Sequence, residues 1–343
     1  MKAMVLNTFN KPLELNEIDM PQIKEDEILL KVRGCGICQT DLKIIGGQIP
    51  PEFVQLPGIP GHEVLGEVVA LGSAISNLSE GDLGIVFLCV FCRECEMCLS
   101  GRQNLCLSLK RVGFDLYGGM AEYICIPAYA FCPFRRDLAL DFPLHDLAIT
   151  SDAIGTPYHA LTSFANLKAG QDILIVGAGG LGLHAVQIAK LYGARVLVAD
   201  KSPDALKCAE DCGADVLLTP EEAPGAVQDL TGGLGVDVVL EIVGIPETLA
   251  WSLSALKRGG KLVIVGYVPG RPFPLDAMDM HFHEWQVIGS RFITKNQLTQ
   301  VIKLIEEGKI KPVVTKTFPF EQANEALNAL RSRTTLGRIV LTF

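Results

Sequence analysis

The segment Asp172-Ile-Leu-Ile-Val-Gly-Ala-Gly-Gly-Leu-Gly182 decides the fold of this chain. Its first half is a short apolar run with β-branched residues, which predicts a buried strand over Asp172–Val176. Gly177, Gly179 and Gly182 then follow the spacing G-x-G-x-x-G, and an apolar pattern with helical period comes after them. Asp200 ends the next predicted strand, 23 residues after Gly177. Strand, glycine turn, helix and acid together predict a dinucleotide site, because the glycines permit close backbone approach and the helix N-terminus faces the pyrophosphate.

Strands and helices alternate through the middle of the chain on either side of this segment. Predicted strands cover residues 172–176, 196–199, 215–218, 237–242, 261–265 and 286–289, and predicted helices cover 204–212 and 246–256. Such alternation is typical of βαβ units and a parallel sheet covered on both faces. The fold class is therefore α/β, with a Rossmann doubly wound parallel sheet.

The first 150 residues have a different pattern, with short apolar runs separated by Gly and Pro. This predicts an irregular β-rich domain of barrel or roll type with few helices. Two helical patterns follow residue 293, and we expect this tail to return to the first domain. The predicted domains are residues 1–152 with 293–343, and residues 153–292. The predicted strands of the first domain are residues 2–6, 27–32, 66–70 and 84–88, and the helices of the tail are 296–307 and 320–332.

The composition limits the partners of the chain. Hydrophobic residues make up 49% of the 343, enough for about two domains with buried cores. The net charge of −9 argues against nucleic acid or an anionic membrane as the main partner. No apolar run reaches the roughly 18 residues of a membrane span, and the N-terminus lacks the pattern of a signal peptide. We therefore expect a cytoplasmic protein that acts on a small molecule.

Four cysteines form a compact motif, Cys92-x2-Cys95-x2-Cys98-x7-Cys106. Four thiolates at these spacings can enclose Zn²⁺ tetrahedrally, which predicts a structural zinc lobe over about residues 89–110. The alternatives are buried free thiols, disulfides or an iron–sulfur cluster. The absence of an export signal argues against disulfides, and nothing else in the chain suggests electron transfer.

Three further residues, Cys38, His62 and Asp152, are candidate ligands of a catalytic zinc. One thiolate, one imidazole and one carboxylate would leave a coordination position open for substrate. Their spacing alone does not bring them together. Taken singly, each is more often a packed core residue or a helix N-cap.

The order of these motifs resembles that of the zinc-dependent medium-chain alcohol dehydrogenases. The matching pieces are Cys-x-Thr-Asp at 38–41, Gly-His-Glu at 61–63, the four cysteines and Val-Gly-Ala-Gly-Gly-Leu-Gly at 176–182. Residues 101–106, 118–123 and 337–338 match as well, so the similarity covers almost the whole chain. The resemblance implies that residues 1–152 and 293–343 form a GroES-like catalytic domain, and that 153–292 form the Rossmann domain.

The resemblance also implies roles at the catalytic zinc. Cys38, His62 and Asp152 would hold the metal, with Asp152 where many members carry Cys. Asp41 would orient the imidazole of His62, and Glu63 would lie near the metal. Thr40 would bond the substrate oxygen and take its proton. Lys43 stands where many members have a histidine that relays this proton to solvent. The alternatives are a relay through a Lys43 of lowered pKa or transfer from the ribose hydroxyl to water.

The cofactor implied is NAD. Gly177, Gly179, Gly180, Leu181 and Gly182 would hold the pyrophosphate. Asp200 would accept hydrogen bonds from the ribose hydroxyls and repel a 2′-phosphate, although the adjacent Lys201 weakens this preference. By resemblance, Arg338 would contact the cofactor phosphates, and Gly244 and Val268 would border the nicotinamide.

The sequence thus predicts an NAD-dependent alcohol dehydrogenase with two zinc ions per chain. It would exchange hydride between an alcohol and NAD to give a ketone or aldehyde, with secondary alcohols or polyols slightly favoured. The resemblance implies a homodimer or homotetramer. One alternative is a zinc-free quinone or enoyl reductase of the same superfamily, which should lack Cys38, His62 and the four cysteines. The other is a non-catalytic NAD- or zinc-binding module, which would need no complete ligand set.

Overall fold

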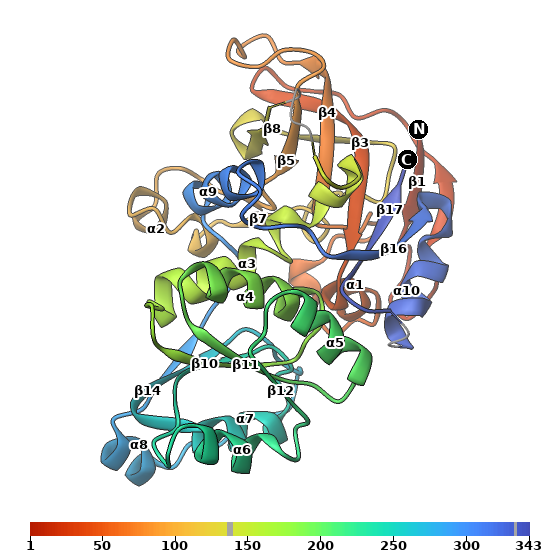
Figure 1. Ribbon diagram of the computed structural model, residues 1–343. Coiled ribbons are helices and arrows are strands. Elements are labelled where there is room, and N and C mark those ends of the chain that lie inside the picture. The colour runs from red at the N-terminus through yellow and green to blue at the C-terminus, as the bar shows by residue number, and fades with distance from the viewer. Residues whose placement is uncertain (136–139, 333–334) are drawn as a thin grey trace. The chain divides into compact units, whose positions relative to one another are not determined.

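The computed structural model describes residues 1–135, 140–332 and 335–343 and divides the chain into two compact units (Figure 1). Unit 1 comprises Met1–Asp152, Ile293–Gly308 and Val314–Phe343. Unit 2 comprises Ala153–Phe292 and Lys309–Val313. Each unit is described by itself below.

Unit 2 contains a six-stranded sheet in the order β12-β11-β10-β13-β14-β15, with every neighbouring pair parallel. The chain order reverses between β10 and β13, which makes this the point where an open α/β sheet binds its ligand. The predicted doubly wound parallel sheet is confirmed. The strands are β10 (Asp172–Val176), β11 (Arg195–Ala199), β12 (Val216–Leu218), β13 (Val236–Glu241), β14 (Leu256–Ile264) and β15 (Gln286–Gly289).

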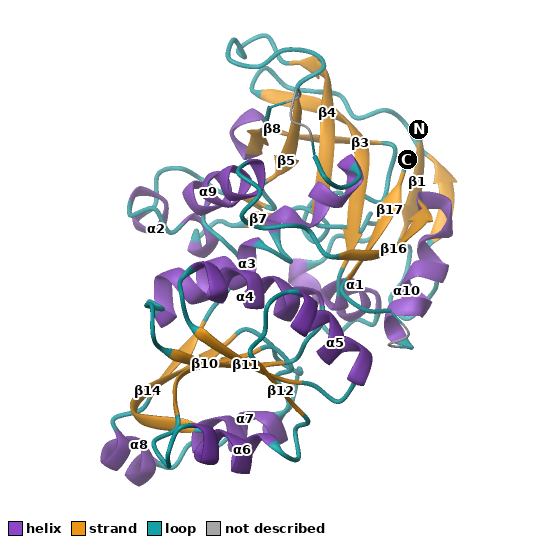
Figure 2. Ribbon diagram, viewed as in Figure 1, coloured by secondary structure: helices purple, strands orange, loops and turns teal. Residues whose placement is uncertain are grey.

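Helices cover both faces of this sheet. Figure 2 shows β10, β11 and β12 between α4 and α5 on one side and α6 and α7 on the other. The helix predicted over 246–256 ends earlier, at Ser254, because Leu256 already pairs with Val236 as the start of β14. The helices are α3 (Gly155–His159), which continues into a π-helical turn (Ala160–Ala165), α4 (Gly180–Leu191), α5 (Pro203–Asp211), α6 (Ala223–Leu230), α7 (Pro246–Ser254) and α8 (Ala277–His283).

Unit 1 is built on a seven-stranded sheet. Its order is β16-β17-β3-β4-β5-β9, and β8 pairs with β3 beside this path. The pairs β1–β2 and β6–β7 form separate two-stranded sheets. The strands are β1 (Lys2–Val5), β2 (Glu14–Glu17), β3 (Glu27–Ile37), β4 (Glu63–Leu71), β5 (Leu83–Val86), β6 (Cys89–Val90), β7 (Lys110–Arg111), β8 (Tyr123–Pro127), β9 (Phe131–Pro133), β16 (Val314–Pro319) and β17 (Arg338–Thr342).

Short helices connect these strands, and two longer ones come from the C-terminal part of the chain. The first 150 residues were expected to contain few helices, and their described part has α1, which directly follows β3, and the one-turn α2. The helices of unit 1 are α1 (Gln39–Ile45), α2 (Glu96–Leu99), α9 (Lys295–Glu306) and α10 (Ala323–Arg331), with 3₁₀ turns η1 (Pro51–Phe53), η2 (Gln103–Leu105), η3 (Ala128–Ala130), η4 (Leu144–Ser151) and η6 (Phe320–Gln322).

Strand β3 is longer than the predicted 27–32 and extends to Ile37. Its glycines make the extension possible. A Cβ on Gly34 would lie 2.8 Å from the carbonyl oxygen of His145, and one on Gly36 would overlap the carboxylate of Glu63. The strand therefore needs small residues where η4 and Glu63 pack against it. Its end places Cys38 at the start of α1.

The segment Lys309–Val313 returns to unit 2 between two parts of unit 1. Gln187 of α4 exchanges two hydrogen bonds with the backbone of Lys311, at 2.9 Å each. The buried imidazole of His184, also on α4, accepts a hydrogen bond from the Val313 amide at 2.9 Å and contacts the Gly180 carbonyl. Helix α4 thus anchors this segment along its length.

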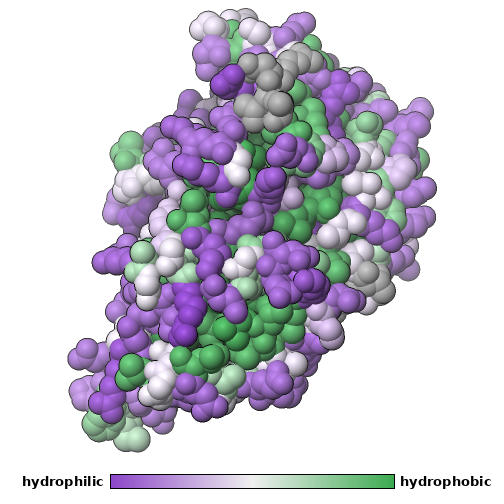
Figure 3. Space-filling view, in the orientation of Figure 1, coloured by the Kyte–Doolittle hydropathy of each residue, from purple (hydrophilic) through white to green (hydrophobic). Residues whose placement is uncertain are grey.

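On the face shown in Figure 3, hydrophilic residues surround sizeable hydrophobic areas, of which a broad one lies on the lower half of the view. None of the described helices has both the length and the apolar character needed to cross a membrane.

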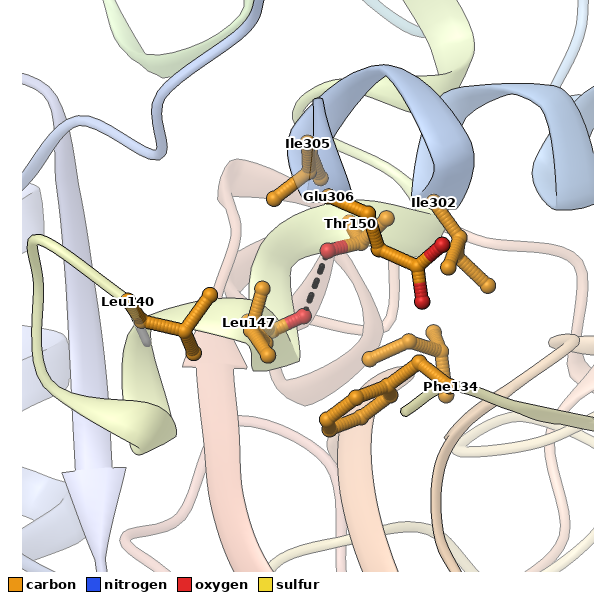
Figure 4. Close-up of a pocket in the computed structure, with 8 residues that line it drawn as sticks. Phe134, Leu140, Leu147, Thr150, Ile302, Ile305 and Glu306 are labelled. Carbon is orange, nitrogen blue, oxygen red and sulfur yellow. Dashed lines mark hydrogen bonds between the residues drawn. The ribbon is translucent and has the colours of Figure 1, made fainter. Parts of the chain in front are cut away.

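A small cavity lies in unit 1 beside η4 and α9 (Figure 4). Its volume of about 10 Å³ is close to the minimum for one water molecule. Thr150 donates to the carbonyl of Leu147 at 2.6 Å, so its hydroxyl is satisfied within η4. The cavity is a packing defect too small for a substrate. It is lined by Ile85, Phe134, Leu140, Leu147, Thr150, Ile302, Ile305 and Glu306.

Candidate functional site

Cys38 stands at the junction between β3 and α1 and caps the helix. Its backbone N–H donates to Oδ2 of Asp41 at 2.8 Å, and the Asp41 amide donates to the Cys38 carbonyl at 3.0 Å. This reciprocal pair of bonds fixes the first turn of α1. The Cys38 side chain is buried. The sequence Cys-Gln-Thr-Asp therefore sets the direction of the thiol through its own helix cap.

His62 and Asp152 reach the same place from two other elements. His62 directly precedes β4, whose first residue, Glu63, pairs with Gly36 of β3. Asp152 follows η4, which packs against β3 and β4. Both side chains are buried. The sheet and η4 therefore bring together residues that are far apart in the sequence.

The three donor atoms form a cluster with the dimensions of a zinc site. Oδ2 of Asp152 lies 3.5 Å from Sγ of Cys38 and 3.6 Å from Nε2 of His62. Bonds of roughly 2.0–2.3 Å at tetrahedral angles would separate such ligand atoms by about 3.3–3.6 Å. All three atoms lie within 4.8 Å of one another. The donor set therefore fits Zn²⁺ with a fourth position left for another ligand.

Asp41 supports His62 from behind. Its Oδ1 lies 3.3 Å from Nδ1 of His62, and both side chains are buried. In the described part of the chain, neither of these two atoms makes another hydrogen bond. A proton on Nδ1 would satisfy both and leave Nε2 available to a metal.

The charges around His62 favour its protonated form when no metal is present. Burial lowers the pKa of His62, but Asp41 and Asp152 outweigh burial and hold this pKa well above its usual value. A zinc ion binds neutral imidazole, so metal uptake must release this proton.

Arg338, the first residue of β17, is buried in the same network. Its Nη2 lies 2.6 Å from Oε1 of Glu63 and 2.9 Å from Oδ2 of Asp152. Burial raises the pKa of Glu63 to about 7, with Arg338 opposing and Asp152 reinforcing this rise. The predicted contact of Arg338 with cofactor phosphates remains a prediction. The structure adds a role that the sequence did not indicate, since Arg338 binds both carboxylates next to the proposed metal.

Thr40 and Lys43 lie on α1, two and five residues after Cys38. At a spacing of three residues they share one face of the helix. Both are half-buried. Burial lowers the pKa of Lys43, although the charge of Cys38 opposes this change.

The four cysteines of the predicted lobe also form a cluster. Sγ of Cys92 lies 3.6 Å from Sγ of Cys106 and 3.8 Å from Sγ of Cys98. Sγ of Cys95 lies 3.5 Å from Sγ of Cys98 and 3.9 Å from Sγ of Cys106. Tetrahedral zinc thiolates with bonds of about 2.3 Å would give separations of about 3.8 Å. All the cysteines of the chain are free thiols, and Cys89, buried in β6, lies outside the cluster.

Backbone amides around this cluster favour thiolates. The N–H of Cys92 donates to Sγ of Cys106 at 3.3 Å, and the N–H of Cys95 donates to Sγ of Cys92 at 3.4 Å. Backbone donors from Leu107 and Cys98 lower the pKa of Cys95 to about 6. The donor set therefore fits a closed, structural zinc site.

The glycine turn of unit 2 joins β10 to α4, as the sequence predicts. Gly177 has φ +101°, a conformation that favours glycine. A Cβ on Gly182 would overlap the Gly177 carbonyl, whereas one on Gly179 would meet open space. Gly180 and Leu181 begin α4. The turn thus leaves the N-terminus of α4 open to a phosphate.

Asp200 follows β11 and holds the glycine turn. Its carboxylate accepts hydrogen bonds from the amides of Ala178, at 2.7 Å, and Ser202, at 2.9 Å. Lys201 is exposed beside it. Gly244 has φ +77° in the turn after β13, and Val268 is half-buried in the loop after β14. Contacts of these residues with a cofactor remain predictions.

Two features of these sites were missed by sequence reasoning. Glu241 is fully buried at the end of β13, and a single carboxylate in the apolar run Val-Val-Leu-Glu-Ile could have drawn attention to it. The second feature is a cluster beside His62. The ring of Phe114 lies 5.5 Å from the ring of His62, and the guanidinium of Arg111 lies over the ring of Phe114. Asp115 binds this guanidinium at 2.7 Å. No local pattern distinguishes this cluster in the sequence.

Comparisons with known proteins agree with this arrangement. A family model described as an alcohol dehydrogenase GroES-like domain matches residues 24–136, and one described as a zinc-binding dehydrogenase matches residues 180–307. The chain is 35% identical to the NAD-dependent alcohol dehydrogenase of Sulfolobus acidocaldarius, over 99% of each chain. It is 34% identical to an alcohol dehydrogenase of Geobacillus stearothermophilus, over 99% of this chain and 98% of the relative.

A solved structure extends the similarity to the fold. The alcohol dehydrogenase from Aeropyrum pernix matches with a TM-score of 0.93 and 30% identity over the whole of both chains. The chain therefore belongs to the zinc-dependent medium-chain alcohol dehydrogenase family.

Proposed function

We propose that this protein oxidises an alcohol to a ketone or aldehyde with NAD as hydride acceptor, and catalyses the reverse reduction. The observation that carries this proposal is the convergence of Cys38, His62 and Asp152 at zinc-ligand distances. A site with three different donors leaves a position for substrate, unlike the closed four-cysteine cluster. The zinc-free reductase and the non-catalytic module are not favoured, because neither requires this set of ligands.

The residues of unit 1 prepare the substrate. Cys38, His62 and Asp152 would hold a zinc ion, which would supply Lewis-acid chemistry at the alcohol oxygen and so lower the pKa of the alcohol. The thiolate and the carboxylate together balance the charge of the ion. Asp41 keeps the imidazole of His62 in the tautomer that presents Nε2.

Thr40 and Lys43 provide a route for the proton. The hydroxyl of Thr40 would take the proton of the alcohol as it gives its own proton to the neutral amine of Lys43, one turn further on α1. The Lys43 ammonium would then release a proton to solvent. A lysine whose pKa is lowered by burial can exchange a proton near neutral pH more easily than an exposed one. Bound NAD would supply the hydride acceptor for the carbon that bears the alcohol oxygen.

The proposal includes a preference for secondary alcohols or polyols. Asp152 supplies a harder oxygen ligand in place of the thiolate found in many members, which should make the zinc slightly more electrophilic. Arg338 binds the same Oδ2 of Asp152 at 2.9 Å and withdraws further negative charge from this position. Both effects favour substrates that donate poorly to the metal.

Metal analysis and a substrate panel test the function. We expect two zinc ions per chain. The panel compares NADH formation with primary alcohols, secondary alcohols, polyols and hydroxyacyl thioesters at equal concentration. Secondary alcohols or polyols should give the highest kcat/KM. One zinc or none, or no NADH with any member of the panel, would contradict the proposal.

The cofactor preference depends on Asp200. We expect wild type to prefer NAD, and Asp200→Ser to reduce its discrimination against NADP because a carboxylate no longer repels the 2′-phosphate. A matched Lys201→Ser variant should show the opposite trend. A wild type that already prefers NADP would contradict this assignment.

The proposed assembly is a homodimer or homotetramer. In the described sheet, β15 pairs only with β14, so its other edge can pair with a second chain. Beside it, α8 exposes the apolar side chains of Met278 and Phe282, which are 61% and 64% accessible. Light scattering should give two or four times the chain mass of 37.1 kDa, and a monomer would contradict the assignment.

The proposed location is the cytoplasm. It is supported by the free thiols of all the cysteines, since disulfides are common in exported proteins. Cell fractionation that finds the protein outside the cytoplasm would reject this location.

A further inference from the structure

Glu241 occupies an unusual position at the carboxyl edge of the sheet in unit 2. It is the last residue of β13 and is fully buried. Its Oε1 accepts a hydrogen bond from the hydroxyl of Thr248, and its Oε2 accepts one from the amide of Gly244, both at 2.7 Å. Burial raises the pKa of Glu241 to about 7. Hydrogen bonds from Thr248, Gly244 and Val243 to its carboxylate lower this pKa but do not outweigh burial. A carboxylate is thus buried with neutral donors that come from the turn after its own strand and from the first turn of α7.

The same residue also holds the turn after the neighbouring strand. Its carbonyl accepts hydrogen bonds from the amides of Val265, at 2.9 Å, and Gly266, at 3.1 Å. The two turns touch through their backbones, because a Cβ on Gly244 would lie 2.5 Å from Cα of Tyr267. Glu241 therefore fastens the β13–α7 turn with its side chain and the turn after β14 with its backbone.

These turns lie where the sheet order reverses. A Cβ on Gly177, in the glycine turn after β10, would lie 3.0 Å from Cγ2 of Val243. A Cβ on Gly182 would lie 3.7 Å from Cδ1 of Ile242. The β13–α7 turn thus packs directly against the turn that is shaped for the pyrophosphate.

The position of Asp200 indicates which half of a dinucleotide meets each turn. Asp200 follows β11, on the side of β10 where the adenosine ribose binds in this fold. The β13–α7 turn is on the other side of β10 and belongs to the second mononucleotide-binding half.

We propose that Glu241 is a positioning residue for the nicotinamide half of NAD, because it fixes the turn Val243–Gly244 beside the glycine turn. This inference rests on the proposed NAD-linked function. Glu241 acts through the backbone of the turn and does not itself take part in hydride transfer.

Glu241→Ala and Glu241→Gln in the full-length zinc-loaded protein test the role. Alanine removes both acceptor oxygens. Glutamine keeps an oxygen for the Gly244 amide, and its NH₂ can donate to Thr248, whose hydroxyl then donates to the Ile245 carbonyl, 3.1 Å away. We expect Glu241→Ala to weaken NADH binding at least about tenfold, and Glu241→Gln to stay within about threefold of wild type.

Leu249→Ala is the matched control for a merely structural effect. Leu249 is buried on α7, outside the turn, so its truncation should lower the melting temperature and leave NADH affinity unchanged. Binding of NADH and of AMP is followed by fluorescence titration and calorimetry. Glu241→Ala should lose affinity for NADH and retain that for AMP, which needs only the adenosine half, and its kcat at saturating NAD should fall.

Two results would overturn the proposal. One is an unchanged NADH affinity in folded Glu241→Ala with normal zinc content. The other is an equal loss of NADH and AMP affinity, as expected from general damage to the unit. If wild type itself bound neither ligand, the NAD-linked function would fail together with this inference, whereas NADH binding without turnover would contradict only the function.

Discussion

The four-cysteine cluster and the Cys38–His62–Asp152 group lie in the same unit, but the chain builds them in different ways. The cysteine ligands are at most 14 residues apart, whereas Cys38 and Asp152 are separated by 114. Backbone amides surround the cysteine sulfurs. Charged side chains, those of Asp41, Glu63 and Arg338, surround the other group.

This difference predicts different roles for the two sites. Four thiolates close the coordination of a metal, and backbone amides donate to the sulfurs of Cys92 and Cys106. Three unlike donors leave a position open, and the buried charges behind them control the proton on His62 and the charge on Asp152. The first site should therefore contribute mainly to folding, and the second mainly to catalysis.

Removing a cysteine ligand from the closed site should have the largest effect. Structural zinc contributes on the order of 10 kcal/mol of binding free energy to small zinc domains, and this is free energy of folding. We expect Cys95→Ser to lose one zinc per chain and to lower the melting temperature strongly. At low temperature its kcat per folded molecule should stay within about twofold of wild type, as checked by metal analysis, thermal unfolding and steady-state rates.

Cys89→Ala is the control, since Cys89 is a buried cysteine outside the cluster. It should keep both zinc ions. Loss of catalysis in Cys95→Ser with an unchanged melting temperature would reverse the assignment of the two sites.

Cys38→Ser should show the opposite behaviour. We expect kcat/KM to fall at least about 10⁴-fold, or about 5 kcal/mol of transition-state stabilisation, because the alcohol is no longer activated by the metal. NADH binding and the zinc of the four-cysteine cluster should remain. The control is Cys35→Ala, a buried cysteine on β3, three residues before Cys38, that is not part of the ligand group. Retained turnover in Cys38→Ser would disprove the catalytic zinc assignment.

Arg338→Met tests whether the open site depends on buried charge. Removing the guanidinium leaves the buried Glu63 without its paired cation and removes one cationic partner of Asp152, which should cost about 3 kcal/mol or more of unfolding free energy in urea. Adding Glu63→Gln removes one of these charges, so the double variant should be more stable than Arg338→Met alone. If the two substitutions are simply additive, the pair does not stabilise the site as a unit.

Local patterns predicted the closed site and the first βαβ unit well. The apolar run Asp172–Val176 is bounded by a charged residue and a glycine, and β10 has the same limits. The four cysteines meet because the short segments between them form tight turns. Prediction was weaker for β3, which was predicted over 27–32 but continues to Ile37 through Gly34 and Gly36, where His145 and Glu63 pack against it.

The open site could not be derived from spacing. Cys38, His62 and Asp152 were selected only because the order of motifs resembles a known family, and the sheet is what brings them together. The contacts of Arg338 with Glu63 span 275 residues, so nothing local indicates them. Glu241 was missed for a related reason, since its partners lie in a turn whose shape depends on the adjacent strand.

Asp41→Asn gives the smallest expected change and tests the supporting contacts. The carboxylate of Asp41 faces two donors, the Cys38 amide at 2.8 Å and Nδ1 of His62 at 3.3 Å. An amide side chain can accept from only one of them, and its NH₂ would then face the other donor. We expect affinity for the catalytic zinc to fall about 10- to 100-fold, measured by competition with a chelator. The four-cysteine zinc in the same molecule is the internal control, because it should resist the chelator equally in both proteins. If both ions were lost together, the two sites would not be independent, and the distinction between them would fail.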